Sequence, residues 1–146
     1  SRHPDWRLQA NNEPAVITCS DVMAEQHPEL VVTFLKAMIK VGRWANEHKR
    51  AASVILDRQT YYRDVEDTYQ CIQHIDMVPS LSPKNLAQIE IGKDFMLEHG
   101  YIKRDFDVQQ WAAPEFLEKA GKELIEERWE KATAAKLPRA TVVRLG

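Results

Sequence analysis

The sequence predicts a mostly helical chain with one or two strands. Three observations support this fold class. From Ser20 onward, apolar residues recur at three- and four-residue steps, which is typical of five or six amphipathic helices. A single apolar, β-branched run at residues 14–19 predicts a strand in the body of the chain. The 146 residues are 44% hydrophobic and 29% charged, which is enough for one domain with a core.

The chain divides into a lead-in, a main segment and a tail. Residues 1–13 have no hydrophobic period, the main segment covers residues 14–135, and residues 136–146 form a basic tail. The apolar residues of the predicted strand are consecutive, which suits a strand buried on both faces. In the tail, residues 141–145 could be a second strand or disordered. A parallel sheet needs several strands, so the chain is either a mostly helical domain or part of a larger protein with more strands upstream.

Local signals place the helices in order. Ser20 or Asp21 can cap a short helix that ends near His27, and Pro28 suits the first turn of an amphipathic helix over residues 28–48. Gly42 inside that helix costs about 1 kcal/mol relative to alanine, which a close neighbour could offset. Shorter helices are expected at residues 51–57 and 63–75.

The second half continues the helical pattern after a loop at residues 76–82. Ser82 and Pro83 form a strong helix start, and Gly100 is a good terminator of that helix. Asp107 followed by Gln110 resembles a capping box at a brief turn. A final helix starts near Pro114 and carries Glu-to-Lys pairs four residues apart, which add a few tenths of a kcal/mol each.

Charge and composition exclude some classes of protein. The 20 basic and 22 acidic residues give a net charge of −2, so we expect no nucleic-acid partner. No apolar run reaches about 18 residues, so no membrane span is expected. Cys19 and Cys71 form one disulfide at most, and two free buried thiols are an equal alternative.

Two groups of side chains could hold a metal ion. Asp67, Cys71 and His74 share one helical face, and all three side-chain types are zinc ligands. Ordinary packing, with Cys71 half-buried and the other two at the rim, is the commoner arrangement. An acidic row at residues 90, 94 and 98 could bind a cation, but such a row is more often a solvated face near lysines such as Lys93. We therefore expect no metal site and no cofactor.

The lead-in offers the only ligand contacts that we predict. Asn11, Asn12 and Glu13 carry hydrogen-bonding groups immediately before the predicted strand, and loops at strand ends commonly bind ligands in α/β folds. A plain surface turn is the alternative. The glycines are scattered singly, so no phosphate-binding glycine loop is present.

The order of several motifs resembles the solute-binding proteins of ABC importers for sulfonate, nitrate or taurine. The resemblance covers roughly residues 14–120 and matches the C-terminal portion of that family. It rests on residues 16–18 (VIT), 24–30 (AEQHPEL), 37–48 (AMIKVGRWANEH), 78–86 (VPSLSPKNL), 95–102 (FMLEHGYI) and 108–117 (VQQWAAPEFL). The last stretch is also similar to the tail of the aromatic sulfinate desulfinases, hydrolases with the same fold.

The resemblance implies an α/β fold of the type II periplasmic-binding-protein-like kind, with two lobes and a ligand cleft. The implied function is part of a solute-binding component for a small anion such as an alkyl or aryl sulfonate. Its partners would be a small anionic ligand, the N-terminal remainder of the same fold and an importer permease. Such a transporter component would be periplasmic or extracytoplasmic.

A desulfinase-like hydrolase, which would be cytoplasmic, and an independent helical interaction domain are the alternatives. The desulfinases' nucleophilic cysteine lies in their upstream half and matches neither Cys19 nor Cys71, so we assign no catalytic residue and no self-contained active site.

Overall fold

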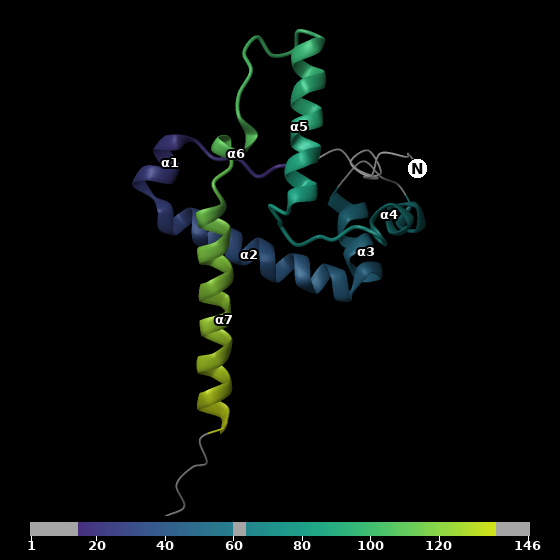
Figure 1. Cartoon of the computed structure of the whole chain (residues 1–146). Coiled ribbons are helices and arrows are strands. Elements are labelled where there is room, and N and C mark those ends of the chain that lie inside the picture. Colours follow the sequence, from purple (N-terminus) through teal and green to yellow (C-terminus); the bar gives the residue numbers. More distant parts are fainter. Residues whose placement is uncertain (1–14, 60–63, 137–146) are drawn as a thin grey trace, which may run out of the picture.

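The computed structural model describes residues 15–59 and 64–136, and within these residues the chain is helical (Figure 1). A long helix, α2, occupies the middle of the fold, and α7 crosses it (Figure 1). The helices are α1 (Asp21–Gln26), α2 (Pro28–Glu47), α3 (Lys49–Gln59), α4 (Val65–Ile72), α5 (Pro83–Glu98), α6 (Val108–Trp111) and α7 (Pro114–Lys136).

The predicted α/β, two-lobed fold is wrong for the part of the chain that the structure describes, because that part contains no strand. Residues 15–20 form an irregular, exposed segment, and Val16 and Ile17 are each about half exposed. A β-branched run becomes a strand only when a neighbouring strand pairs with its backbone N–H and C=O groups. The described residues supply no such neighbour. The possible second strand at 141–145 lies outside them.

The predicted helix starts are confirmed where the signal was a capping side chain. Ser20 accepts a hydrogen bond from the Met23 amide at 3.2 Å, and Ser82 accepts one from the Asn85 amide at 3.3 Å. These bonds satisfy amides that have no partner inside the helix. Asp107 caps α6 in the same way, and Asp64 caps α4 without having been predicted. Gly100 ends α5 with a positive φ of 72°.

Among the described residues, two small apolar clusters form the core, and α2 contributes to both. One cluster joins α2 to α7 through Val32, Leu35, Ile39, Ala120 and Leu124. The other joins the end of α2 to α3 and α4 through Ala45, Ala52 and Ile72. By contrast, α5 stands apart from these clusters and packs against α6 (Figure 1).

Ion pairs reinforce the crossing of α2 and α7. The Lys36 ammonium lies 2.9 Å from a Glu123 carboxylate oxygen and 2.5 Å from one of Glu127. Lys40 lies 3.3 Å from the other Glu127 oxygen. These contacts raise the pKa of Lys36, mainly through the hydrogen bond to Glu127, and lower the pKa of Glu127.

The connection between α4 and α5 is held against α2 by side-chain hydrogen bonds. Asn46 on α2 donates to the Asp76 carboxylate at 2.7 Å and accepts from the Met77 amide at 3.0 Å. Asp76 in turn accepts from the Val78 amide at 2.9 Å. Lys49 donates to the Asn46 amide oxygen at 2.9 Å. This network fixes the course of residues 75–78, where Met77 and Val78 reach the two apolar clusters.

None of the helices in the described ranges combines the length and apolar character needed to cross a membrane.

Candidate functional site

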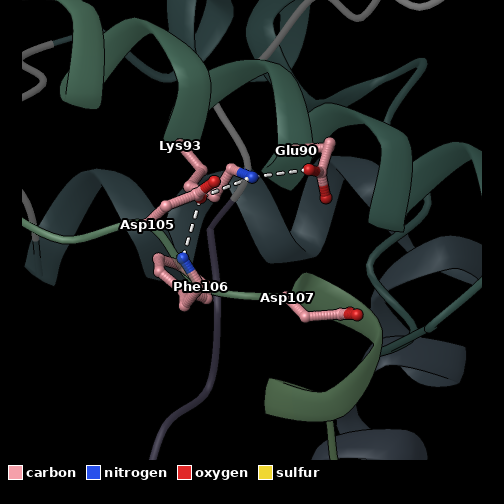
Figure 2. Close-up of a pocket in the computed structure, with 5 residues that line it drawn as sticks. All are labelled: Glu90, Lys93, Asp105, Phe106 and Asp107. Atoms are coloured by element: carbon pink, nitrogen blue, oxygen red, sulfur yellow. Dashed lines mark hydrogen bonds and ion pairs between the residues drawn. The ribbon is translucent and has the colours of Figure 1, made fainter.

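The candidate pocket lies between the outer half of α5 and the segment that leads into α6 (Figure 2). It is an open hollow of about 480 Å³. Glu90 and Lys93 come from α5, one turn apart, while the opposite wall comes from the approach to α6. That wall consists of Asp105, Phe106 and Asp107.

Lys93 is the centre of this pocket and is 5% exposed. Its ammonium lies 2.6 Å from Glu90, 2.9 Å from Asp105 and 3.3 Å from Asp94. An ammonium group has three N–H donors, so three carboxylates can satisfy it completely. The hydrogen bonds to Glu90 and then Asp105 raise the pKa of Lys93 above its ordinary value of 10.5, against the opposing effect of burial.

The carboxylates around Lys93 also have structural partners. Asp105 accepts a hydrogen bond from the Phe106 amide at 2.8 Å, and its pKa is lowered mainly by the hydrogen bond from Lys93. Asp107 points away from Lys93 and accepts from the first amides of α6, at 2.8 Å from Gln109 and 3.1 Å from Gln110 (Figure 2). The pocket therefore fastens the approach to α6 onto α5.

The charge of the pocket limits the chemistry that it can perform. Lys93 is protonated at neutral pH, as an ordinary lysine is, and its raised pKa favours the ammonium form further. It therefore has no lone pair with which to act as a nucleophile or base. Three carboxylates line the pocket beside this one cation. A small anion such as a sulfonate would meet net negative charge there. We conclude that this pocket is a structural junction and does not suit the anionic ligand expected from the sequence.

The residues predicted from the sequence to bind a ligand, Asn11, Asn12 and Glu13, lie outside the described residues. Their role remains a prediction.

The predicted face of α4 is only partly formed. Asp67, Cys71 and His74 are all exposed, and α4 ends at Ile72, so His74 follows the helix. Across residues 15–59 and 64–136, no group of three or more metal-ligating side chains has a geometry that could hold an ion.

The acidic row on α5 differs from a plain solvated face. Glu90 and Asp94 both bind Lys93, and Glu98 is exposed. Sequence reasoning placed Lys93 near the row but missed its burial and its pairing with Asp105, twelve residues further along. No local pattern reports such a pairing, because it depends on the turn that returns the chain to α5.

The two cysteines are free and exposed. The predicted alternative of a disulfide is therefore wrong for this structure, and so is the expected burial of free thiols. Neither thiol has a hydrogen bond to a histidine within the described part of the chain.

Comparison with known proteins supports one of the two families that the motifs resemble. Over 111 residues, the chain is 28% identical to 2'-hydroxybiphenyl-2-sulfinate desulfinases of Rhodococcus erythropolis and Rhodococcus qingshengii. The aligned region covers 75% of this chain and 30% of each relative, so the chain spans less than a third of their length. No family model matches the chain. No solved structure matches it either.

These comparisons change the order of the hypotheses. The similarity supports the desulfinase-like alternative in part, at the level of a partial, distant relationship. The solute-binding component of an importer, which was the first expectation, receives no support from them.

Proposed function

We propose that the chain is a helical part of a desulfinase-like hydrolase that acts on an aryl sulfinate. The observation that carries this proposal is the similarity to the Rhodococcus desulfinases over three quarters of the chain. The reaction class is hydrolytic: the carbon–sulfur bond of the sulfinate breaks, the ring carbon takes a proton from water, and the hydroxyl group of the water joins the sulfur. The products are the arene and hydrogen sulfite, HSO3⁻. On this proposal the protein is cytoplasmic.

The described residues support a scaffold role within such an enzyme. In the pocket around Lys93, the ammonium group is already paired with Glu90 and Asp105. The acidic lining of this pocket disfavours binding of an anionic sulfinate. Cys19 and Cys71 are both free and exposed. We therefore assign the reacting groups to the rest of the proposed enzyme and the support of that part to this chain.

The proposal is tested by complementation. The R. erythropolis desulfinase is produced without the 111 residues that match this chain, and sulfite release from 2'-hydroxybiphenyl-2-sulfinate is measured with and without the chain added. We expect no sulfite from either polypeptide alone and measurable release from the mixture. Equal rates with and without the chain, under conditions where the two polypeptides bind each other, would contradict the proposal.

The matched control is a chain in which Val108 is replaced by aspartate. Val108 is 1% exposed at the start of α6, and burying an unpaired charge there destabilises the fold. This variant should fail to restore sulfite release. Restoration by the variant would show that the folded helices are not needed.

A further inference from the structure

The outer face of α2 is apolar and uncovered. It consists of Leu30, Phe34, Ala37, Val41 and Trp44, all of which are exposed. The exposed fractions of the four large side chains run from 39% at Trp44 to 59% at Val41. The residues follow one another at steps of four, three, four and three, which places them in a single line along the helix.

The opposite side of α2 is already buried. Val32, Leu35 and Ile39 pack against α7, and Gly42 lies against the backbone of Met77. Only a narrow polar strip that includes Lys36, Lys40 and Arg43 separates the two apolar sides along one edge. A helix that is apolar around most of its circumference is ordinarily buried within a larger protein.

A second copy of the chain is a poor cover for this face. The four large side chains, each about half exposed, offer roughly 400 Å² per copy. Two copies placed face to face would bury roughly 800 Å², below the 1,200 Å² or so of a stable, specific interface, so the face needs a cover that extends beyond these four side chains. The flanking charges do not compensate, because Lys36 and Lys40 are engaged by Glu123 and Glu127 of α7.

The proposed enzyme supplies a different occupant. The chain spans only 30% of the length of its Rhodococcus relatives, so more than two thirds of such an enzyme is available to cover the face. We infer that the outer face of α2 is the surface by which this chain docks onto an uncharged, apolar surface of the remaining part of the same enzyme. This inference rests on the proposed function.

The test measures binding of the chain to the R. erythropolis desulfinase that lacks the matching 111 residues. Isothermal titration calorimetry is performed with wild-type chain, with Val41→Asp and with Arg43→Asp. Val41 is on the outer face, whereas Arg43 is an exposed residue two positions along on the polar strip. We expect wild type and Arg43→Asp to bind with similar affinity, and Val41→Asp to bind at least tenfold more weakly. Absence of binding by wild type, or equal weakening by both substitutions, would overturn the inference.

The isolated chain gives a second, independent measurement. Because Val41 faces solvent there, Val41→Asp should leave the helical circular-dichroism signal and the Tm of the chain unchanged. A large loss of either would show that the face is part of the chain's own core, which would also overturn the inference. If the two polypeptides bind in a way that depends on Val41 but their mixture releases no sulfite, the docking face is supported and the proposed function is rejected.

Discussion

Gly42 in α2 packs directly against the carbonyl group of Met77 in the connection between α4 and α5. A Cβ atom at position 42 would overlap the Met77 carbonyl oxygen and lie 2.8 Å from the carbonyl carbon, closer than real Cβ contacts. Glycine is therefore required at this position because the neighbouring atoms belong to the backbone of a loop. A backbone cannot move aside as easily as the end of a flexible side chain. The same loop is held by Asn46, one turn further along α2.

Replacing Gly42 by alanine should destabilise the chain. Alanine ordinarily favours a helix over glycine by about 1 kcal/mol, but the overlap with Met77 forces the loop outward at a cost of about 1–3 kcal/mol or more. Urea unfolding followed by circular dichroism measures the net change in the free energy of unfolding.

Gly92 in α5 and Gly121 in α7 are the matched controls, since a Cβ at either position meets nothing within 4 Å. Gly121→Ala and Gly92→Ala should each stabilise the chain by about 0.5–1 kcal/mol. A stabilising Gly42→Ala would contradict the close approach to Met77.

Removal of the Asn46 side chain should release the loop. Asn46→Ala leaves the Met77 backbone amide without its acceptor. It also removes the side-chain amide that donates to the Asp76 carboxylate. Loss of the part-buried bond from Met77 and of the exposed bond to Asp76 costs about 1–3 kcal/mol in total. The Tm of Asn46→Ala, compared with that of Glu47→Ala at an exposed position of the same helix, measures this effect. A Tm for Asn46→Ala no lower than that of Glu47→Ala would show that the network contributes nothing.

The stability of the chain should fall in acid partly through Asp76. Its pKa is lowered from an ordinary 3.8, mainly by the hydrogen bond from the Val78 amide and then by that from Asn46. A lowered pKa stabilises the folded chain above pH 3.8, and this contribution is lost as the pH falls through the lowered value. Thermal melts of wild type and Asp76→Asn between pH 2 and pH 7 should therefore converge at low pH. A constant difference in Tm across that range would contradict the assignment.

Several features of the fold could be predicted because they depend on residues close together in sequence. The caps at Ser20, Ser82 and Asp107 each involve an amide two or three residues away, so the sequence contains the whole interaction. The strand expected at residues 14–19 needs a partner strand, which no local pattern can guarantee. That prediction failed for this reason.

Contacts between distant residues account for what the sequence did not reveal at the site. Lys93 pairs with Asp105 across the turn at Gly100, and Gly42 meets Met77 from 35 positions away. Both contacts require the path of the connecting loop, which follows from packing. The sequence predicts one amphipathic helix over residues 28–48 and does not separate its buried apolar residues from the exposed ones of the outer face.

Lys93 should control the order of the segment between α5 and α6. Lys93→Met removes the cation and leaves Glu90, Asp94 and Asp105 to repel one another. Hydrogen exchange at residues 101–107 should become severalfold faster, whereas Lys103→Met, at an exposed position, should leave it unchanged. Unaltered exchange in Lys93→Met would mean that the ion pairs do not hold this segment.

The Lys93 junction should also weaken at both extremes of pH. Because the pKa of Asp105 is lowered from 3.8, its contribution is lost as the pH falls below that value. Because the pKa of Lys93 is raised from 10.5, its contribution is present below that pH and is lost as the pH rises through the raised value. The difference in Tm between wild type and Lys93→Met, measured against pH, should shrink at both extremes. A difference that stays constant across the range would contradict the assignment.

Sulfite release by a single-chain chimera is the decisive test of the proposed function. In this chimera, the 111 matching residues of the R. erythropolis desulfinase are replaced by those of the present chain, and a deletion of the same residues is the reference. We predict that the chimera releases sulfite from 2'-hydroxybiphenyl-2-sulfinate well above the rate of the deletion. A chimera that is folded and monodisperse, yet no faster than the deletion, would contradict the claim that this chain is a working part of a desulfinase-like hydrolase.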